Sequence, residues 1–179
     1  MITREQYLMG RDVAFPEDFT PEISDNADVT IFKANAMYAE MAKDGVEPAN
    51  DQVTGNWVAS GLRPKAINDR TANAATLSPH LTAEGLDTQD HQDRRIARWC
   101  LGDKGRAAMA RIGIWMEHPQ WTSKKNLETG TRDPWVHWQT RPPLSGLRFF
   151  RPSLGPPTAP SLPGQVGVCA IFPYEEEVA

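Results

Sequence analysis

The chain has 179 residues, a formal net charge of −4 and two cysteines. This length is sufficient for the core of one compact domain, and without a basic stripe nucleic acid is excluded as the main partner. No apolar run approaches the roughly 18 residues of a membrane span, the charged N-terminal segment lacks the apolar core of a signal peptide, and Cys100 and Cys169 make no disulfide framework.

Taken in chain order, the sequence predicts helices packed on a small antiparallel sheet, which is an α+β fold. Apolar residues at helical spacing predict a helix over residues 28–44 that ends at Gly45. A short strand over Trp57–Ser60 leads into the turn at Pro64, and a hairpin or wide turn follows over 80–87. The later predicted elements are helices over 92–101 and 104–112, joined or broken near Gly102, and short strands from Trp115 and over Trp135–Gln139. Because the strands do not alternate regularly with helices, a parallel α/β sheet is not expected.

Two separated segments contain a candidate metal-ligand set. S-P-H-L-T-A-E-G-L-D supplies His80 and Asp87, and W-V-H-W-Q supplies His137. Two histidines and one carboxylate are a set that Zn²⁺ accepts when a fourth position stays open for chemistry. The chain also contains His91, in a polar run typical of a solvated loop or helix start, and His118, before a proline that indicates a turn.

The spacing of the first two candidate ligands constrains their backbone. Seven residues of helix would separate His80 from Asp87 by about 10.5 Å along the axis, too far for one metal ion. We therefore expect a hairpin or wide turn, with Gly85 supplying the backbone freedom. Strand alternation places Trp135 and Gln139 on the same face as His137, while the residues between them pack into the core.

These segments resemble the M15 family of zinc D-Ala-D-Ala carboxypeptidases and endopeptidases, in its small phage-borne, endolysin-related branch. The family pattern S-x-H-x-x-G-x-A-x-D matches at Ser78, His80 and Asp87, whereas Ala83 and Gly85 exchange the usual glycine and alanine. Four further stretches carry the resemblance: I-T-R-E-Q-Y-L-M-G-R-D at the N-terminus, S-G-L-R-P at 60–64, I-G-I-W-M-E at 112–117 and R-P-P-L-S-G-L-R-F-F at 141–150. The resemblance extends over about residues 1–152.

The resemblance implies an M15/hedgehog-like peptidase fold and a role for each matched residue. Zn²⁺ would be held by the three candidate ligands and would lower the pKa of its water toward about 7. Arg63 matches the family arginine that meets the substrate, and its planar guanidinium suits a carboxylate or carbonyl. Ser78 would hold the hairpin or bond the substrate, and Trp135 would line the substrate cleft.

The general base departs from the family pattern. Many relatives have an acidic residue three positions before the last histidine, but this chain has Pro134 there. Asp133 is the nearest carboxylate and our first candidate for the base, and Glu117 is the second. The ligands are thus better defined by the sequence than the base.

The composition changes after residue 152. A proline-rich run, P-S-L-G-P-P-T-A-P-S-L-P-G, predicts an extended strap or linker, and an apolar segment and an acidic end follow it. We therefore divide the chain into a peptidase-like domain (1–152) and a C-terminal tail (153–179) that covers its own domain or docks on another protein.

Two functions follow from these observations. The first is a phage-encoded hydrolase of peptidoglycan stem or cross-link peptides, made in the host cytoplasm without a signal peptide and acting on the cell wall after release or from the virion. The alternative is a virion structural or adaptor protein that reuses the fold and attaches to other virion proteins through residues 153–179.

Overall fold

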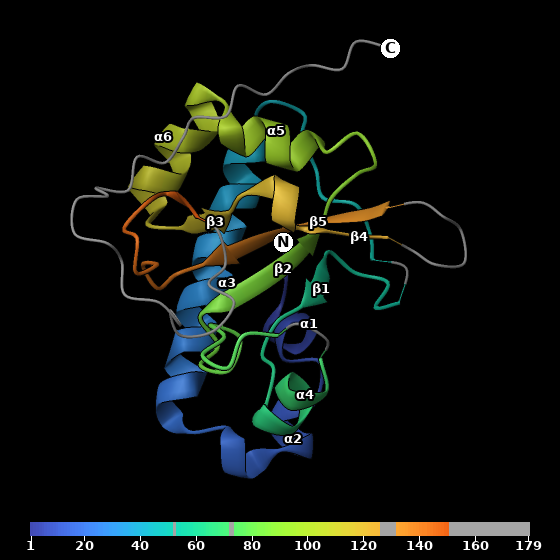
Figure 1. The fold of residues 1–179 in the computed structure, drawn as a ribbon, viewed down its shortest axis with the longest axis vertical. Helices are drawn as coiled ribbons and strands as arrows, with labels where there is room; N and C mark the ends of the chain where they lie inside the picture. Colours follow the sequence, from blue (N-terminus) through green and yellow to red (C-terminus); the bar gives the residue numbers. More distant parts are fainter. Residues whose placement is uncertain (52, 72–73, 126–131, 151–179) are drawn as a thin grey trace, which may run out of the picture.

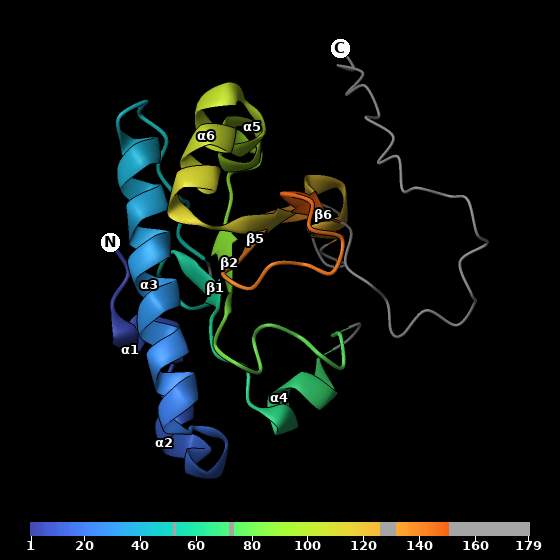
Figure 2. The same cartoon turned by 90° about the vertical axis from the view of Figure 1, so that its left-hand side faces the viewer.

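The computed structural model describes residues 1–51, 53–71, 74–125 and 132–150. The long helix α3 (Pro21–Ala42) crosses one face of a small sheet, as Figures 1 and 2 show from two directions. Helices α5 and α6 gather at one end of the molecule, and the short helices α1, α2 and α4 lie toward the other end (Figure 1). The predicted α+β class is confirmed.

The sheet is mixed and not wholly antiparallel as predicted. Its strands run in the order β1–β2–β5–β3–β6, and β4 pairs with the far end of β5. The first three of these pairings are antiparallel, but β3 and β6 are parallel. The bounds are β1 Val58–Ser60, β2 Gly85–Gln89, β3 Trp115–Glu117, β4 Ser123–Lys125, β5 Arg132–Gln139 and β6 Phe149–Phe150.

Helix α3 begins seven residues before the predicted start at residue 28. Thr20 caps it by accepting a hydrogen bond from the backbone N–H of Ile23, and Pro21 occupies the first turn, where its missing N–H costs nothing. The helix ends at Ala42, close to the predicted end. The polar residues of its first two turns hide this extension from a search for apolar spacing.

The remaining helices are short. A capping box between Thr3 and Gln6 starts α1, and Gly102, in an extended conformation, separates α5 from α6, so the predicted interruption is confirmed as two helices. Their bounds are α1 Arg4–Leu8, α2 Arg11–Ala14, α4 Lys65–Arg70, α5 Arg95–Leu101 and α6 Asp103–Ile112, with 3-10 turns η1 Pro16–Asp18 and η2 Pro119–Trp121.

The buried carboxylate of Asp90 holds the start of α5. It accepts hydrogen bonds from the backbone N–H groups of His91 at 2.8 Å, Ile96 at 3.0 Å and Ala97 at 3.1 Å. We expect Asp90→Ala to lower the free energy of unfolding by about 2–4 kcal/mol, because buried N–H groups lose their acceptor. Urea denaturation of the metal-free protein measures this loss.

Asp93 provides the matched control for that substitution. It is a surface residue that pairs with Arg95 and Arg98, and such pairs contribute little. Asp93→Ala should leave the free energy of unfolding close to that of the wild type. Equal losses in the two variants would contradict a specific role of Asp90 in holding α5.

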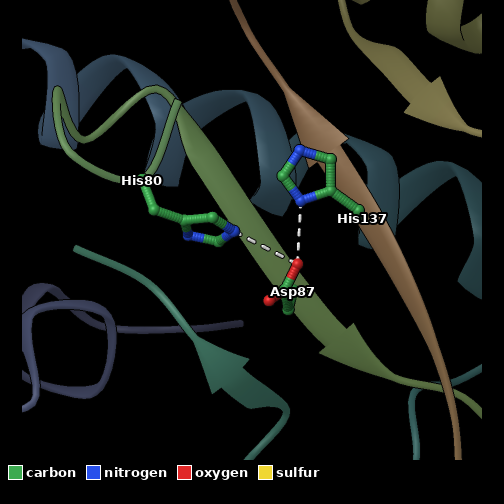
Figure 3. A group of neighbouring side chains, drawn as sticks. All are labelled: His80, Asp87 and His137. Atoms are coloured by element: carbon green, nitrogen blue, oxygen red, sulfur yellow. Dashed lines mark hydrogen bonds and ion pairs between the residues drawn. The ribbon is translucent and has the colours of Figure 1, made fainter. Parts of the chain in front are cut away.

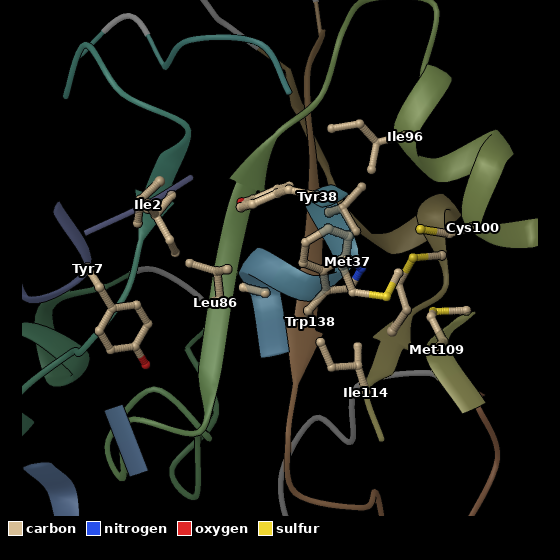
Figure 4. Packing of buried hydrophobic residues seen from close by; sticks show 14 of the residues in the cluster. Ile2, Tyr7, Met37, Tyr38, Leu86, Ile96, Cys100, Met109, Ile114 and Trp138 are labelled. Carbon is tan, nitrogen blue, oxygen red and sulfur yellow. The ribbon is translucent and has the colours of Figure 1, made fainter. Parts of the chain in front are cut away.

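The core lies between the sheet and helices α3, α5 and α6 (Figure 4). Val136 and Trp138 are buried in it, as strand alternation predicts. Trp138 packs against Tyr38 of α3, with ring centroids 5.5 Å apart. Cys100 is also buried there as a free thiol. The opposite face of β5 is therefore left for His137 and its neighbours.

Within the described ranges, none of the helices combines the length and apolar character needed to cross a bilayer. The C-terminal tail predicted over 153–179, including Cys169, lies outside the residues that the structure describes.

Candidate metal centre

The structure brings the three predicted ligands together on the face of the sheet opposite α3 (Figure 3). His80 lies in the turn before β2, Asp87 in β2 and His137 directly across from Asp87 in β5. All three are buried, with 3%, 8% and 6% of their surfaces exposed. Their ligand atoms lie within 4.8 Å of one another, and the described residues contain no other such group.

The donor set fits a small divalent metal ion. Asp87 Oδ1 lies 3.3 Å from His80 Nε2 and 2.8 Å from His137 Nδ1. Tetrahedral zinc with bonds of 2.0–2.2 Å separates its ligand atoms by about 3.4 Å, so these two pairs need only a small opening. Two neutral nitrogens and one carboxylate leave a fourth position without a protein ligand, which is the arrangement of catalytic zinc sites.

The segment Gly61–Arg63 fixes the orientation of His80. The His80 Nδ1 lies 2.7 Å from the carbonyl oxygen of Gly61, and the Arg63 N–H donates to the His80 carbonyl oxygen at 2.9 Å. A carbonyl only accepts, so Nδ1 carries the proton and Nε2 presents its lone pair to a metal ion. The S-G-L-R-P motif therefore acts through its backbone on the imidazole.

The turn that carries His80 is anchored to α1 and α3. The buried hydroxyl of Tyr7 lies within hydrogen-bond distance of the Ala83 and Gly85 carbonyl oxygens, at 2.8 and 2.9 Å. Thr30 of α3 donates to the same Ala83 carbonyl oxygen at 2.8 Å. Neither Tyr7 nor Thr30 is predicted from the sequence to support the site. Tyr7 lies in the N-terminal stretch that resembles the phage branch, which is the one signal that was available.

The predicted role of Gly85 needs correction, because the left-handed residue of this turn is Ala83, with φ of 56°. Gly85 is required for space instead. A Cβ at Gly85 would lie 3.3 Å from His137 Cε1 and 3.1 Å from the backbone nitrogen of His80. A glycine at position 85 thus leaves room for the metal ligands, and the left-handed conformation of Ala83 costs about 1 kcal/mol.

Arg63 contacts the metal ligands. Its guanidinium lies 3.4 Å from Asp87 Oδ2 and donates to Ser60 Oγ at 3.2 Å, and only 12% of its side chain is exposed. Ser78 is buried, and its Oγ accepts a hydrogen bond from the His80 N–H at 3.3 Å. Of the two roles predicted for Ser78, this contact supports the one that holds the turn.

The charges of the group support one another. Burial alone would raise the pKa of Asp87, but His80 and the hydrogen bond with His137 outweigh it and hold this pKa well below its usual range. Burial lowers the pKa of His80 despite Asp87. Burial would also lower the pKa of His137, but the hydrogen bond with Asp87 outweighs burial, so the pKa of His137 is raised. The anionic Asp87 and neutral His80 are in the state that binds metal, whereas His137 must release its proton when the metal binds.

Of the two candidate general bases, Glu117 is the one whose side chain lies within the described residues. Trp115 pairs with Gln139 and Met116 with Trp138, so β3 lies beside the strand that carries His137, and Glu117 is near enough for the charges of His137 and Asp87 to act on it. Glu117 is buried, and burial raises its pKa to about 7, with His137 opposing the shift and Asp87 adding to it. Asp133, the first candidate from sequence, lies in β5 opposite Lys124, and its side chain is outside the described part.

The other predicted residues lie around this centre or away from it. Trp135 is half-buried and shares the face of β5 with His137, as alternation predicts. His91 lies apart, with Nε2 2.8 Å from the Glu47 carbonyl oxygen. His118 is likewise outside the ligand group.

Comparison with known proteins gives no further assignment: no family model, curated protein or solved structure matches this chain.

Proposed function

We propose that this chain is a zinc-dependent peptidase that hydrolyses peptidoglycan stem or cross-link peptides. The observation that carries the proposal is the buried group of His80, Asp87 and His137, with the carboxyl group of Glu117 in the next strand. A metal with three protein ligands and an acid–base group beside it is the combination that metal-dependent peptide hydrolysis uses. The peptidoglycan substrate and a phage origin rest on the M15 resemblance of the motifs.

Zinc held by these three residues would supply a Lewis acid that polarises a peptide carbonyl and increases the acidity of water. Glu117 then accepts the proton of the attacking water as the water oxygen bonds to the carbonyl carbon. When the carbon–nitrogen bond breaks, Glu117 returns that proton to the departing amine. A pKa of about 7 suits both steps, because the group exchanges a proton readily near neutral pH.

The surrounding residues support this chemistry by holding the ligands. Gly61 fixes the His80 tautomer, and the Arg63 guanidinium contacts the Asp87 oxygen that does not contact His137. Trp135, half-buried on the ligand face of β5, provides an aromatic surface for the substrate. Such outer contacts typically change metal affinity or activity by about 10- to 100-fold.

The direct test is mass spectrometry of muropeptides after purified peptidoglycan is incubated with the zinc-loaded protein. We expect a product in the zinc-loaded sample that is missing after chelator treatment, and its mass names the bond that is cut. An unchanged muropeptide profile from protein with bound zinc would contradict the proposed activity.

Substitution of a ligand should remove both metal and activity. For His137→Ala we expect zinc affinity to fall by at least about 100-fold, because only two of three ligands remain. Metal content after dialysis, measured by atomic emission, checks this. His91→Ala, a histidine outside the group, is the matched control and should retain stoichiometric zinc. Equal zinc content in both variants would place the metal elsewhere.

A further inference from the structure

Arg11 carries a half-buried guanidinium group with no acidic partner within the described part of the chain. Its Nη1 donates a hydrogen bond to the carbonyl oxygen of Leu62. No carboxylate of the described residues lies within ion-pair distance of it, although Arg4, in the preceding helix, pairs with Asp28. The charge of Asp87 acts on Arg11 without forming an ion pair with it, so the remaining N–H donors of the guanidinium are available to an anionic ligand.

Arg11 follows a sharp change of chain direction between α1 and α2. Met9 and Gly10 are consecutive left-handed residues, with φ of 57° and 70°, and they reverse the chain between α1 and α2. For Met9 this conformation is strained by about 1–2 kcal/mol, and such strain is commonly retained near functional sites. Both views place α1, α2 and α4 at the same end of the molecule (Figures 1 and 2).

One short segment, Gly61–Arg63, connects Arg11 with the metal ligands. The Gly61 carbonyl oxygen accepts a hydrogen bond from His80 Nδ1, and the Leu62 carbonyl oxygen accepts one from the Arg11 guanidinium. The Arg63 side chain contacts Asp87. Arg11 is therefore hydrogen-bonded to Leu62, which lies between Gly61 and Arg63, the two residues that contact the metal ligands.

The two arginines differ in what they contact. Arg63 is occupied by Asp87 and Ser60. Arg11 retains further N–H donors, and burial together with the charge of Arg63 lowers its pKa, a shift that Asp87 only partly opposes. An anion bound by Arg11 would relieve this repulsion.

We propose that Arg11 binds the C-terminal carboxylate of the peptide substrate, and that Arg63 is a positioning residue for Asp87. This assignment rests on the proposed peptidase function for the identity of the ligand. A guanidinium fork matches the two oxygens of a carboxylate, and a neutral amide at the same place satisfies it less well.

The test measures binding and not turnover. N-acetyl-D-alanine and its neutral C-terminal amide are titrated into the full-length, metal-free protein by NMR, so that the carboxylate has no metal to ligate. We expect the wild-type protein to bind the acid about tenfold or more tightly than the amide. Arg11→Gln should abolish this preference, and Arg11→Lys should retain part of it.

Arg4→Gln is the matched control, because it removes one positive charge at the surface of the neighbouring helix. It should leave the preference for the acid unchanged. Equal binding of acid and amide by the wild-type protein would overturn the assignment. So would an Arg11→Gln variant, folded by circular dichroism, that still prefers the acid.

Zinc titrations separate the two arginines. Arg63→Gln should weaken zinc binding by about 10- to 100-fold, whereas Arg11→Gln should leave it unchanged. A loss of zinc affinity in Arg11→Gln equal to that in Arg63→Gln would make Arg11 a support of the ligands and refute a separate anion site. The two proposals can fail separately. If this chain is not a peptidase but Arg11 does bind a carboxylate, the metal-free protein still binds N-acetyl-D-alanine more tightly than its amide, although no peptide is cut.

Discussion

Glu117→Gln is expected to abolish peptidase activity while making the metal-free protein more stable. Glutamine has nearly the same shape but cannot accept a proton, so kcat should fall by about 10²- to 10⁴-fold. Zinc content should stay stoichiometric, because Glu117 is not one of the three grouped ligands. Hydrolysis assays and metal analysis of the same preparation measure both effects.

The stability gain follows from the direction of the Glu117 pKa shift. Burial raises this pKa from 4.5 to about 7, so between these pH values the folded chain keeps a proton that the unfolded chain has lost. Stability therefore falls as the pH rises through this window, and above it the charged carboxylate costs about 3 kcal/mol. Glutamine removes that cost: the variant should be more stable than the wild type at pH 8 and equal to it near pH 4.

Asp133→Asn is the rival substitution in the same assay, since Asp133 is the other candidate base. We expect it to retain most activity. If Asp133→Asn is inactive and Glu117→Gln remains active, Asp133 is the base and the role assigned to Glu117 is wrong.

Gly61→Ala is expected to be the most damaging single-methyl substitution near the site. A Cβ at this position would lie 2.0 Å from the backbone oxygen of Tyr7, and backbone cannot move aside cheaply. We expect a loss of at least about 3 kcal/mol of folding stability. Zinc affinity should fall as well, because the displaced Gly61 carbonyl oxygen no longer orients His80.

Gly102→Ala tests whether any glycine near a carbonyl would give the same result. Its Cβ would lie 3.4 Å from the Trp99 oxygen, an ordinary contact, and its φ of −73° is open to alanine. Thermal unfolding and zinc titration should find this variant close to the wild type. A comparably small effect of Gly61→Ala would contradict the close approach of α1 to the 60–64 segment.

The ligand set was predictable because it depends on residue type and on two local rules. The His80–Asp87 spacing excludes a helix, and alternation along β5 separates His137 from Val136 and Trp138. Both rules hold in the structure. The residue that adopts the left-handed conformation was not predictable, since a buried Ala83 is held there by hydrogen bonds from other parts of the chain.

Other features depend on pairings between distant segments, which spacing alone does not indicate. The parallel pairing of β3 with β6 joins residues more than thirty positions apart and makes the sheet mixed. Glu117 was ranked behind Asp133 because Asp133 is nearer to His137 in sequence, whereas the β3–β5 register brings Glu117 near in space. Arg11 lies in the N-terminal stretch that carries the resemblance, but the sequence assigns it no role, because its importance comes from a charge left without an ion pair by folding.

The pairing of Asp87 with His137 also bears on how the chain finds its fold. A slip of one residue between β2 and β5 would place Leu86 or Thr88 opposite His137 and turn Asp87 toward the core side. Only the native register therefore presents a complete set of ligands. If zinc is present during folding, its binding energy stabilises only chains in which β2 and β5 pair in the native register. The ion would then select the correct strand alignment before it takes part in any reaction.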